Sequence, residues 1–368
     1  MTPQRIDIIA GARPNFMKIA PIIRSLERHR AAGGCLDYRL VHTGQHYDER
    51  MSGDFFRQLG IPMPHVNLGA GSGTQAEQTA SIMVGYERAL TESPSHACLV
   101  VGDVTSTMAC AIVARKIGIP VYHVEAGIRS GDWAMPEEIN RVVTDSITNE
   151  FFTTSRWAGE NLRQHGAKAE HIHFVGNTMI DTLLANLERL SPPEFWDAQG
   201  LSSGGYLVLT LHRPSNVDST ERLSVLLETI DRHVGGLRVV FPVHPRTAKR
   251  LSEIGRTIPS LLCVEPPPYL QFNYLVRHAM GVLTDSGGIT EETTVLGVPC
   301  MTLRDSTERP ETVRVGTNEL LGTDPSAIGP ALERLRKGTW KKGEIPELWD
   351  GNAATRIVET LARLHGAS

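Results

Sequence analysis

Three acidic side chains stand where open α/β sheets place catalytic acids and bases. Asp103 and Glu125 directly follow apolar, strand-like runs, and Glu137 lies in the first turn of an expected helix. Ligands in such sheets bind beyond the carboxyl ends of the strands. His212, directly after the apolar run at residues 206–211, adds a group that titrates near neutrality. These four side chains predict general acid–base catalysis.

Each acidic residue also has a purely structural interpretation. Asp103 could cap the helix that follows it, which taken alone is the more common use. Glu137 follows a proline at a helix start, where acids stabilise the helix dipole, and it could pair with Arg141 one turn on. Glu137 and Glu138 cannot both face one site, because neighbours on a helix project about 100° apart. Glu125 has the weakest structural explanation, because a lone carboxylate after an apolar strand is costly to bury.

A second group of residues is suited to a phosphate-bearing ligand. Residues 285–288 read Asp-Ser-Gly-Gly between an apolar run and a helical pattern. Glycines allow close approach of a ligand, and the amides at a helix N-terminus bind phosphate, although a plain strand-to-helix turn is the alternative. Arg13, after the first strand, could bind a diphosphate with its guanidinium, and Lys18 could reach the same side. A solvated arginine in a turn is the alternative there.

The elements that must position these residues form two series. Apolar, β-branched runs and helical patterns alternate in both halves of the chain, which predicts parallel sheets covered by helices. The expected strands lie at residues 6–10, 38–42, 97–101 and 121–124, then at 206–211, 238–243, 261–264, 280–284 and 298–303. We predict two Rossmann-like α/β domains at residues 1–175 and 176–351. A terminal helix at residues 352–368 is expected to pack back on the first domain.

The composition excludes several classes of protein. The 368 residues suit two domains, and 37 Lys and Arg against 41 Asp and Glu give no global attraction to nucleic acid or to an anionic membrane. Five scattered cysteines without a CxxC pair argue against zinc and disulfides and favour a reducing cytoplasm. No run approaches the ~20 apolar residues that span a bilayer. We therefore predict a cytoplasmic protein with no metal and no membrane or nucleic-acid partner.

These motifs together resemble the non-hydrolysing UDP-N-acetylglucosamine 2-epimerases along nearly the whole chain. The family's catalytic positions are an Asp in GD-x-x-ST, a Glu in HVEAG-x-R, the first Glu of PEE-x-NR and a His in HR. They match Asp103, Glu125, Glu137 and His212. The family's UDP site pairs DSGG-x-x-EE with RD-x-TERPE, and both occur here. The predicted substrate and UDP contacts are Arg13, Lys18, His46, Arg213, His244, Phe272, Ser286, Gly287, Gly288, Glu292 and Arg309.

The resemblance implies individual roles for several of these contacts. Ser286 and Gly287 would contact phosphate, Glu292 the ribose hydroxyls and Arg309 the nucleotide. Phe272 would stack on uracil, with a buried core aromatic as the alternative. The resemblance also implies a GT-B fold with a cleft between the domains, a homodimer and no cofactor. The reaction would eliminate UDP to a 2-acetamidoglucal and add it back on inversion of C2.

Several segments depart from the commonest bacterial pattern. The chain has GARPNFMK in place of GTRPEAIK and TGQHYD in place of TAQHREM, which is more similar to the archaeal branch and to enzymes acting on UDP-2,3-diacetamido-glucuronic acid. That substrate is therefore one alternative. A hydrolysing 2-epimerase, a GT-B glycosyltransferase and a non-catalytic UDP-sugar sensor are the others. A nicotinamide-dependent 4-epimerase is excluded, because the chain has neither an N-terminal dinucleotide fingerprint nor a Tyr-x-x-x-Lys pair.

Overall fold

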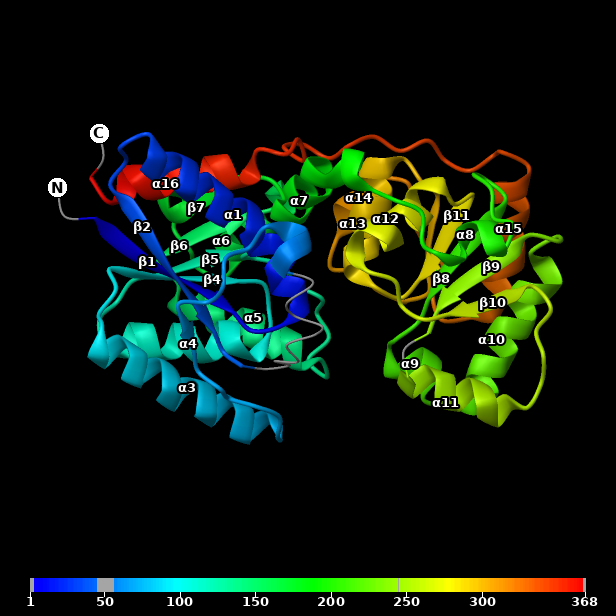
Figure 1. Cartoon of the computed structure of the whole chain (residues 1–368), viewed down its shortest axis with the longest axis horizontal. Helices are drawn as coiled ribbons and strands as arrows, with labels where there is room; N and C mark the ends of the chain where they lie inside the picture. The colour runs from blue at the N-terminus through cyan, green and yellow to red at the C-terminus, as the bar shows by residue number, and fades with distance from the viewer. Residues whose placement is uncertain (1–2, 45–55, 244, 367–368) are drawn as a thin grey trace. The chain divides into compact units, whose positions relative to one another are not determined.

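The computed structural model describes residues 3–366 apart from residues 45–55 and 244, and omits the side chains of residues 13, 214–215 and 245–246. The chain forms two compact units (Figure 1). Unit 1 comprises Met1–Ala185 and Glu347–Ser368, and unit 2 comprises Asn186–Pro346. The sequence placed the corresponding boundaries at residues 175 and 351. Within the described residues, no helix is both long and apolar enough to cross a membrane.

Unit 1 is built on a parallel sheet of seven strands in the order β3-β2-β1-β4-β5-β6-β7. The strands are β1 (Gln4–Ala10), β2 (Leu36–His42), β3 (Val66–Asn67), β4 (Ala97–Val101), β5 (Val121–Val124), β6 (Glu150–Thr153) and β7 (Ile172–Phe174). The chain order reverses between β1 and β4, so these neighbouring strands mark the topological switch point at which ligands bind in such sheets.

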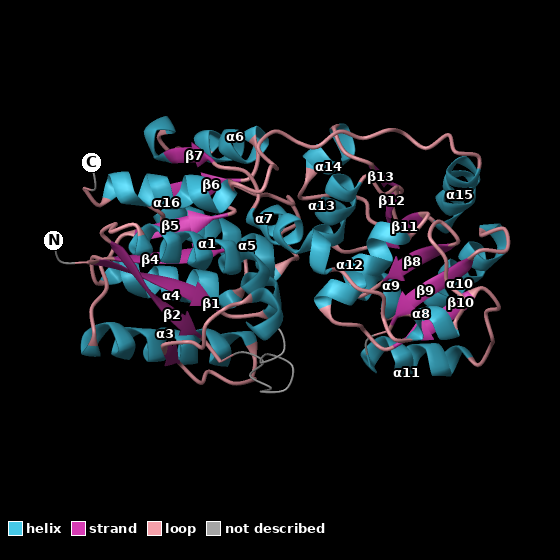
Figure 2. Cartoon of the chain, turned by 45° about the horizontal axis from the view of Figure 1, so that its top comes forward, coloured by secondary structure: helices cyan, strands magenta, loops and turns pink. Residues whose placement is uncertain are grey.

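Helices cover both faces of this sheet (Figure 2). They are α1 (Arg13–Ala31), α3 (Gln75–Glu92), α4 (Thr105–Lys116), α5 (Pro136–Ile147), α6 (Arg156–Gln164), α7 (Thr178–Asn186) and α16 (Ala353–Leu364). The terminal helix α16 packs against α1. The Asp181 carboxylate on α7 accepts hydrogen bonds from the Ala353 and Ala354 amides at 3.1 and 2.7 Å, which satisfies the N-terminus of α16.

Unit 2 repeats this architecture with six parallel strands in the order β10-β9-β8-β11-β12-β13. The strands are β8 (Tyr206–Thr210), β9 (Arg238–Pro242), β10 (Leu261–Val264), β11 (Gly281–Thr284), β12 (Cys300–Thr302) and β13 (Asn318–Leu320). The helices are α8 (Phe195–Ala198), α9 (Pro214–Val217), α10 (Thr220–His233), α11 (Pro245–Ile254), α12 (Tyr269–His278), α13 (Gly287–Leu296), α14 (Pro310–Arg314) and α15 (Ile328–Arg336).

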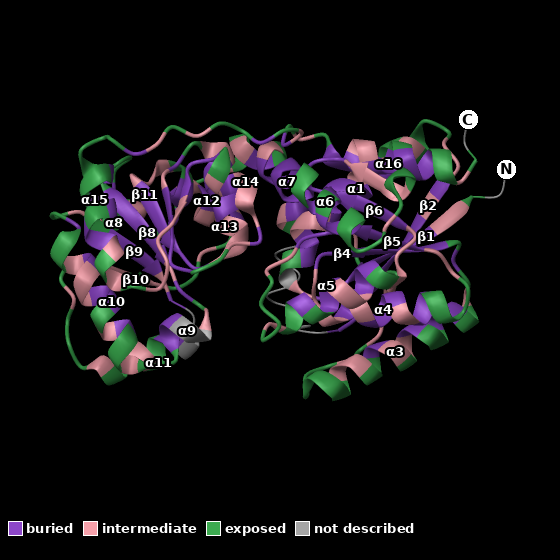
Figure 3. Ribbon diagram, turned by 180° about the vertical axis from the view of Figure 1, so that it is seen from behind, coloured by how far each residue is buried: buried purple, intermediate pink, exposed green. Residues whose placement is uncertain are grey.

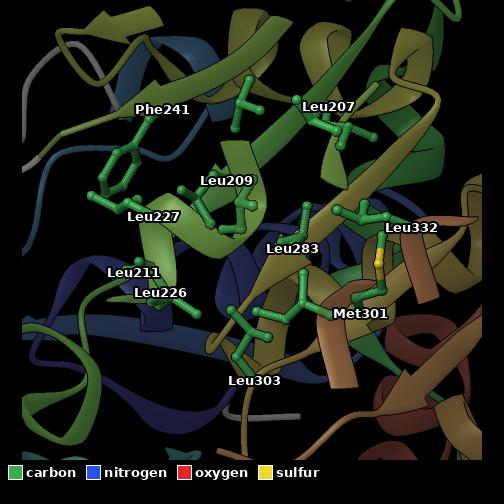
Figure 4. Close-up of a cluster of buried hydrophobic side chains, with 14 of the residues drawn as sticks. Leu207, Leu209, Leu211, Leu226, Leu227, Phe241, Leu283, Met301, Leu303 and Leu332 are labelled. Atoms are coloured by element: carbon green, nitrogen blue, oxygen red, sulfur yellow. The ribbon is translucent and has the colours of Figure 1, made fainter. Parts of the chain in front are cut away.

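The alternation of side chains along each strand divides the core of unit 2 into two layers. Leu207, Leu209 and Leu283 pack with helices α10 and α15 on one face of the sheet (Figure 4). Tyr206 and Val208, one residue out of phase, pack with α12 on the other face. The central strands β8, β11 and β12 are almost wholly buried, whereas the helices alternate between buried and exposed positions (Figure 3).

The prediction of two doubly wound α/β domains is confirmed. Three expected strands, at residues 97–101, 121–124 and 261–264, have the predicted bounds. The sequence missed β3, β6, β7 and β13, which lie at or next to the sheet edges. These strands have two to four residues, and β6 begins with Glu150 while β7 contains His173. Such short, partly polar runs do not give the apolar signal on which strand prediction depends.

Candidate active site

Hydrogen bonds between strands and loops fix the carboxyl ends of β1, β4 and β5 in unit 1. The Asn15 side chain, 2% exposed, donates to the Val101 carbonyl at 2.9 Å and accepts from the Gly11 amide at 3.1 Å. The Gly102 amide donates to the Val124 carbonyl at 3.0 Å. The loops that carry the candidate acids therefore start from one rigid edge of the sheet.

Asp103 is held by an arginine from helix α5. Arg141 donates from Nε and Nη2 to Asp103 Oδ2 at 3.0 and 2.5 Å, and the Asp103 side chain remains 27% exposed. The Asn140 amide group donates to the Asp103 carbonyl at 2.8 Å. The capping alternative for Asp103 is wrong, because Val104 occupies the N-cap of α4 and makes no side-chain cap bond. The carboxylate is thus an oriented and accessible group beside a cation.

Glu125 is a buried carboxylate in a strained backbone conformation. Its φ is +66°, in the left-handed region that residues other than glycine rarely adopt, and it is 4% exposed. The Lys18 ammonium lies 2.5 Å from Glu125 Oε2. Gly102, beside this pair, has φ +70°, which favours glycine, and an added Cβ would lie 3.1 Å from Lys18 Nζ. Strain of this kind is concentrated at functional sites, whose surroundings maintain it.

Glu137 and Glu138 have different environments on the first turn of α5. Glu137 is exposed, whereas Glu138 is 2% exposed and accepts from the Ser130 and Gly131 amides at 2.9 and 3.0 Å. Burial opposes ionisation of Glu138, but these amides and Arg141 hold the pKa of Glu138 below its usual value. Among the described contacts, Arg141 forms ion pairs with Glu138 and Asp103, so the structure does not support the alternative in which Arg141 pairs with Glu137.

His212 in unit 2 forms a pair with a carboxylate that the sequence did not single out. His212 Nδ1 lies 2.7 Å from Asp285 Oδ1, and the His212 side chain is 58% exposed while that of Asp285 is fully buried. Asp285 also accepts from the Arg213 amide and the Asn216 amide group, both at 3.0 Å. Although burial opposes it, these contacts lower the pKa of Asp285. The ionised Asp285 therefore orients the ring with Nδ1 toward the carboxylate, which leaves Nε2 on the opposite side of the ring.

The N-terminus of α13 combines helix amides with arginine side chains. Ser286 occupies the N-cap, and Gly287 and Gly288 form the first turn. A Cβ on Gly287 would meet nothing closer than Glu308 Oε2 at 3.8 Å. Glu308 pairs through both oxygens with Arg304 at 2.7 and 3.0 Å, and Arg213 Nη2 lies 3.6 Å from Glu308 Oε1. This open helix terminus, with two guanidinium groups linked through Glu308, suits a phosphate.

The remaining predicted nucleotide contacts are more enclosed. Glu292 is 4% exposed, its Oε1 accepts from the Asn273 amide group at 3.3 Å, and burial raises its pKa to about 7. Arg309 forms an ion pair with the buried Glu291. Phe272 is half-buried and packs against the hydrophobic layer between the sheet and α12. A nucleotide contact for these three residues stays a prediction.

Three of the predicted substrate and UDP contacts involve side chains that the structure does not describe. His46 and His244 lie outside the described residues. Arg13 is the first residue of α1, directly beyond the end of β1, and its side chain is not described. Clusters of three or more potential metal-binding side chains are absent from the described part of the chain.

Comparison with known proteins assigns the chain to a family. A family model described as UDP-N-acetylglucosamine 2-epimerase matches residues 28–362. The chain is 40% identical over 370 residues to UDP-N-acetylglucosamine 2-epimerase of Methanocaldococcus jannaschii, covering 97% of this chain and 98% of that one. The chain belongs to the UDP-N-acetylglucosamine 2-epimerase family.

Solved structures of this family share the fold over the full length of the chain. The crystal structure of Methanocaldococcus jannaschii UDP-GlcNAc 2-epimerase in complex with UDP-GlcNAc and UDP matches with a TM-score of 0.86 and 40% identity, covering 98% of this chain and 99% of that one. UDP-2,3-diacetamido-2,3-dideoxy-D-glucuronate 2-epimerase of Pseudomonas aeruginosa is 37% identical over 98% of this chain and 100% of that one. Likeness to both kinds of enzyme agrees with the sequence interpretation of the motif departures.

The epimerase-like site also contains partners that sequence reasoning did not select. Asp285 was quoted only as the start of the Asp-Ser-Gly-Gly motif, and Arg141 only as a possible partner of Glu137. Asn15 was not selected at all. Its position after a strand could have identified Asp285 as a candidate. Asp285 is the first residue after β11, and Asp103 is the second residue after β4. Their partners could not be read from the sequence, because each contact joins residues far apart in the chain.

Proposed function

We propose that this protein is a non-hydrolysing 2-epimerase that interconverts UDP-N-acetylglucosamine and UDP-N-acetylmannosamine. The observation that carries the proposal is the pair of carboxylates at the ends of β4 and β5, each with its own cation. Asp103 contacts Arg141, and Glu125 contacts Lys18. Two oriented carboxylates on adjacent strands suit proton transfer at a carbon that must be approached from both faces.

The reaction consumes no water and needs no oxidant or reductant. A carboxylate removes the C2 proton, the C–H electrons form the C1=C2 double bond, and the C1–O bond breaks so that UDP leaves with its electron pair. The product is 2-acetamidoglucal. UDP then adds back to C1 as C2 accepts a proton on the opposite face, which gives the C2 epimer.

Unit 2 would retain the UDP between the two steps. The α13 terminus at Ser286, Gly287 and Gly288 is suited to the diphosphate, and Arg213 would balance charge as the leaving group develops. His212, oriented by Asp285 at 2.7 Å, would donate a proton or hydrogen bond to the departing diphosphate. Arg13 and the exposed Glu137 are proposed to contact the substrate from unit 1. Assignment of the base step to Asp103 or Glu125 is left to experiment.

The test is proton and phosphorus NMR of the protein with UDP-GlcNAc in D2O. The proposal predicts deuterium at C2 and a mixture of UDP-GlcNAc and UDP-ManNAc without accumulation of UDP. Free UDP together with ManNAc would show a hydrolysing 2-epimerase instead. Transfer of the sugar only when an acceptor is added would indicate a glycosyltransferase, and tight binding without exchange would indicate a sensor.

A second substrate is favoured by one comparison. The 37% identity to the Pseudomonas aeruginosa diacetamido-glucuronate 2-epimerase covers both chains almost completely. The same chemistry at C2 would apply, but the substrate would carry a second acetamido group at C3 and a carboxylate at C5. A kcat/KM higher on this substrate than on UDP-GlcNAc would reassign the specificity and keep the mechanism. The homodimer and the cytoplasmic location stay predictions.

A further inference from the structure

A fully buried histidine lies beneath the loops that carry the two carboxylates. His123 is in β5 and is 0% exposed. Its Nδ1 lies 2.7 Å from Asp145 Oδ1, and its Nε2 lies 2.8 Å from the Gly102 carbonyl oxygen. A carbonyl oxygen only accepts hydrogen bonds, so Nε2 must carry a proton. The protonation of Nδ1 depends on Asp145.

Asp145 has enough donors around it to remain ionised. Arg129 Nη1 lies 2.6 Å from Asp145 Oδ2, and the Gly127 amide donates to the same oxygen at 3.1 Å. Burial disfavours the charged carboxylate, but His123 and Arg129 outweigh this effect and lower the pKa of Asp145. An ionised Asp145 accepts from Nδ1–H, so both ring nitrogens of His123 donate and the ring is an imidazolium.

This buried ion pair connects the loops after β4 and β5 with helix α5. Gly102, the acceptor of His123, immediately precedes Asp103. Gly127, a donor to Asp145, lies two residues after Glu125. Helix α5, which carries Asp145, also carries Arg141, whose guanidinium binds Asp103. These contacts join the loops of the two carboxylates and helix α5 through one charged network.

We propose that His123 and Asp145 are positioning residues that fix the loops of Asp103 and Glu125 relative to each other. The inference rests on the proposed function, because it concerns the geometry of the two proposed acid–base groups. A buried charged pair with all its hydrogen bonds made costs much to disrupt, so it resists relative movement of the loops. Misplacement by about 1 Å can lower a catalytic rate by about 100-fold.

The kinetic test uses His123→Gln and Asp145→Asn in the full chain. Each should lower kcat for C2 deuterium exchange by about 100-fold, with KM and UDP affinity nearly unchanged, because neither residue is among the proposed UDP contacts. The double variant should lose little more than either single variant, because the two residues act as one unit. His173→Gln is the matched control, since it replaces a histidine of β7 whose Nε2 lies 2.7 Å from a carboxylate oxygen of Glu150 on β6. It should leave the exchange rate unchanged.

A spectroscopic measurement tests the network without catalysis. In the isotope-labelled wild-type protein, the His123 ring signals, assigned through the backbone of the wild type itself, should show protons on both Nδ1 and Nε2. A neutral His123 ring would overturn the proposal, even where the variants fail to fold. If the wild type is active and His123→Gln exchanges C2 deuterium at the wild-type rate, the proposal is overturned as well. A wild type inactive on both UDP-sugars would instead contradict the proposed function.

Discussion

At the scale of single residues, the candidate site depends on charged partners that orient each acid–base group. Asp103 has Arg141, Glu125 has Lys18 and His212 has Asp285. The partner fixes which oxygen or nitrogen faces a ligand, and it also sets the charge of the pair. Substitution of a partner should therefore affect the chemical step more than it affects substrate binding.

Asp285→Asn should lower the rate of C2 exchange by roughly 100-fold or more, because the amide cannot hold His212 as the ionised carboxylate does. The change retains the size of the side chain and an oxygen that can accept from the Arg213 amide. Deuterium incorporation at C2 measures the rate, and calorimetric titration with UDP measures binding, which should change little. Asp324→Asn, at an exposed turn, is the control. A wild-type rate in Asp285→Asn would refute the orienting role.

Glu292 should make the folded state less stable as pH rises. Its folded pKa is about 7, against an ordinary value of 4.5, so between these values the folded protein holds a proton that the unfolded chain releases. Stability therefore falls from about pH 4.5 to 7, in total on the order of 3 kcal/mol. Glu292→Gln should be stabilised relative to wild type at pH 8 and not at pH 4.5. Urea unfolding at both pH values measures this, with the exposed Glu344→Gln as control.

At the scale of elements, the site is set by the turns that follow the parallel strands. The turn after β5 holds Glu125 at φ +66° and Gly127 at φ +79°. Gly127 is also pressed against helix α6, because an added Cβ would lie 2.2 Å from the Ala158 carbonyl oxygen. Packing of α6 on this turn therefore helps to maintain the backbone conformation of Glu125.

Gly127→Ala should destabilise unit 1 and impair catalysis together. The alanine would face both a left-handed φ and the Ala158 backbone, which cannot move as a flexible side chain can. We expect a loss of about 2 to 4 kcal/mol, measured by urea unfolding. Gly118→Ala is the control, because Gly118 has φ +84° but no atom within 4 Å of an added Cβ. It should show only the cost of backbone strain, about 1 kcal/mol, with normal activity.

At the scale of the whole molecule, unit 1 is discontinuous in sequence and unit 2 is continuous. The terminal segment belongs to unit 1 through Trp349 and α16. Trp349 is 1% exposed and donates from its indole to the Thr154 carbonyl at 3.1 Å. Ile357 and Leu361 of α16 are both fully buried. Unit 1 therefore cannot complete its core until the last residues are available.

A chain ending at Pro346 should lose the folding of unit 1 and retain that of unit 2. The deletion exposes the face of α1 that α16 covers and removes the buried Trp349. Calorimetry should show the transition of one unit missing, and C2 exchange should be absent. A chain lacking only residues 367–368 is the control and should resemble the full chain. Two intact transitions in the shorter chain would show that α16 is dispensable for unit 1.

The sequence by itself determined the fold class and most candidate positions. Apolar runs in alternation with amphipathic helices predict two parallel α/β domains, because both faces of such strands must be covered. The motifs placed Asp103, Glu125 and His212 at the ends of strands, and the structure has them there. Local pattern is sufficient for this much, because a residue's distance from a strand end is a property of the chain alone.

Only the tertiary structure decided which charges meet. Arg141 binds Asp103 from 38 residues away, and Asp285 holds His212 from 73 residues away. The sequence could not choose between Glu137 and Glu138 as the partner of Arg141, and it could not identify His123 as a link between two loops. Such pairings depend on the order of strands and on how each helix turns over the sheet. These features arise from packing, whose free energy is shared among residues that are distant in sequence.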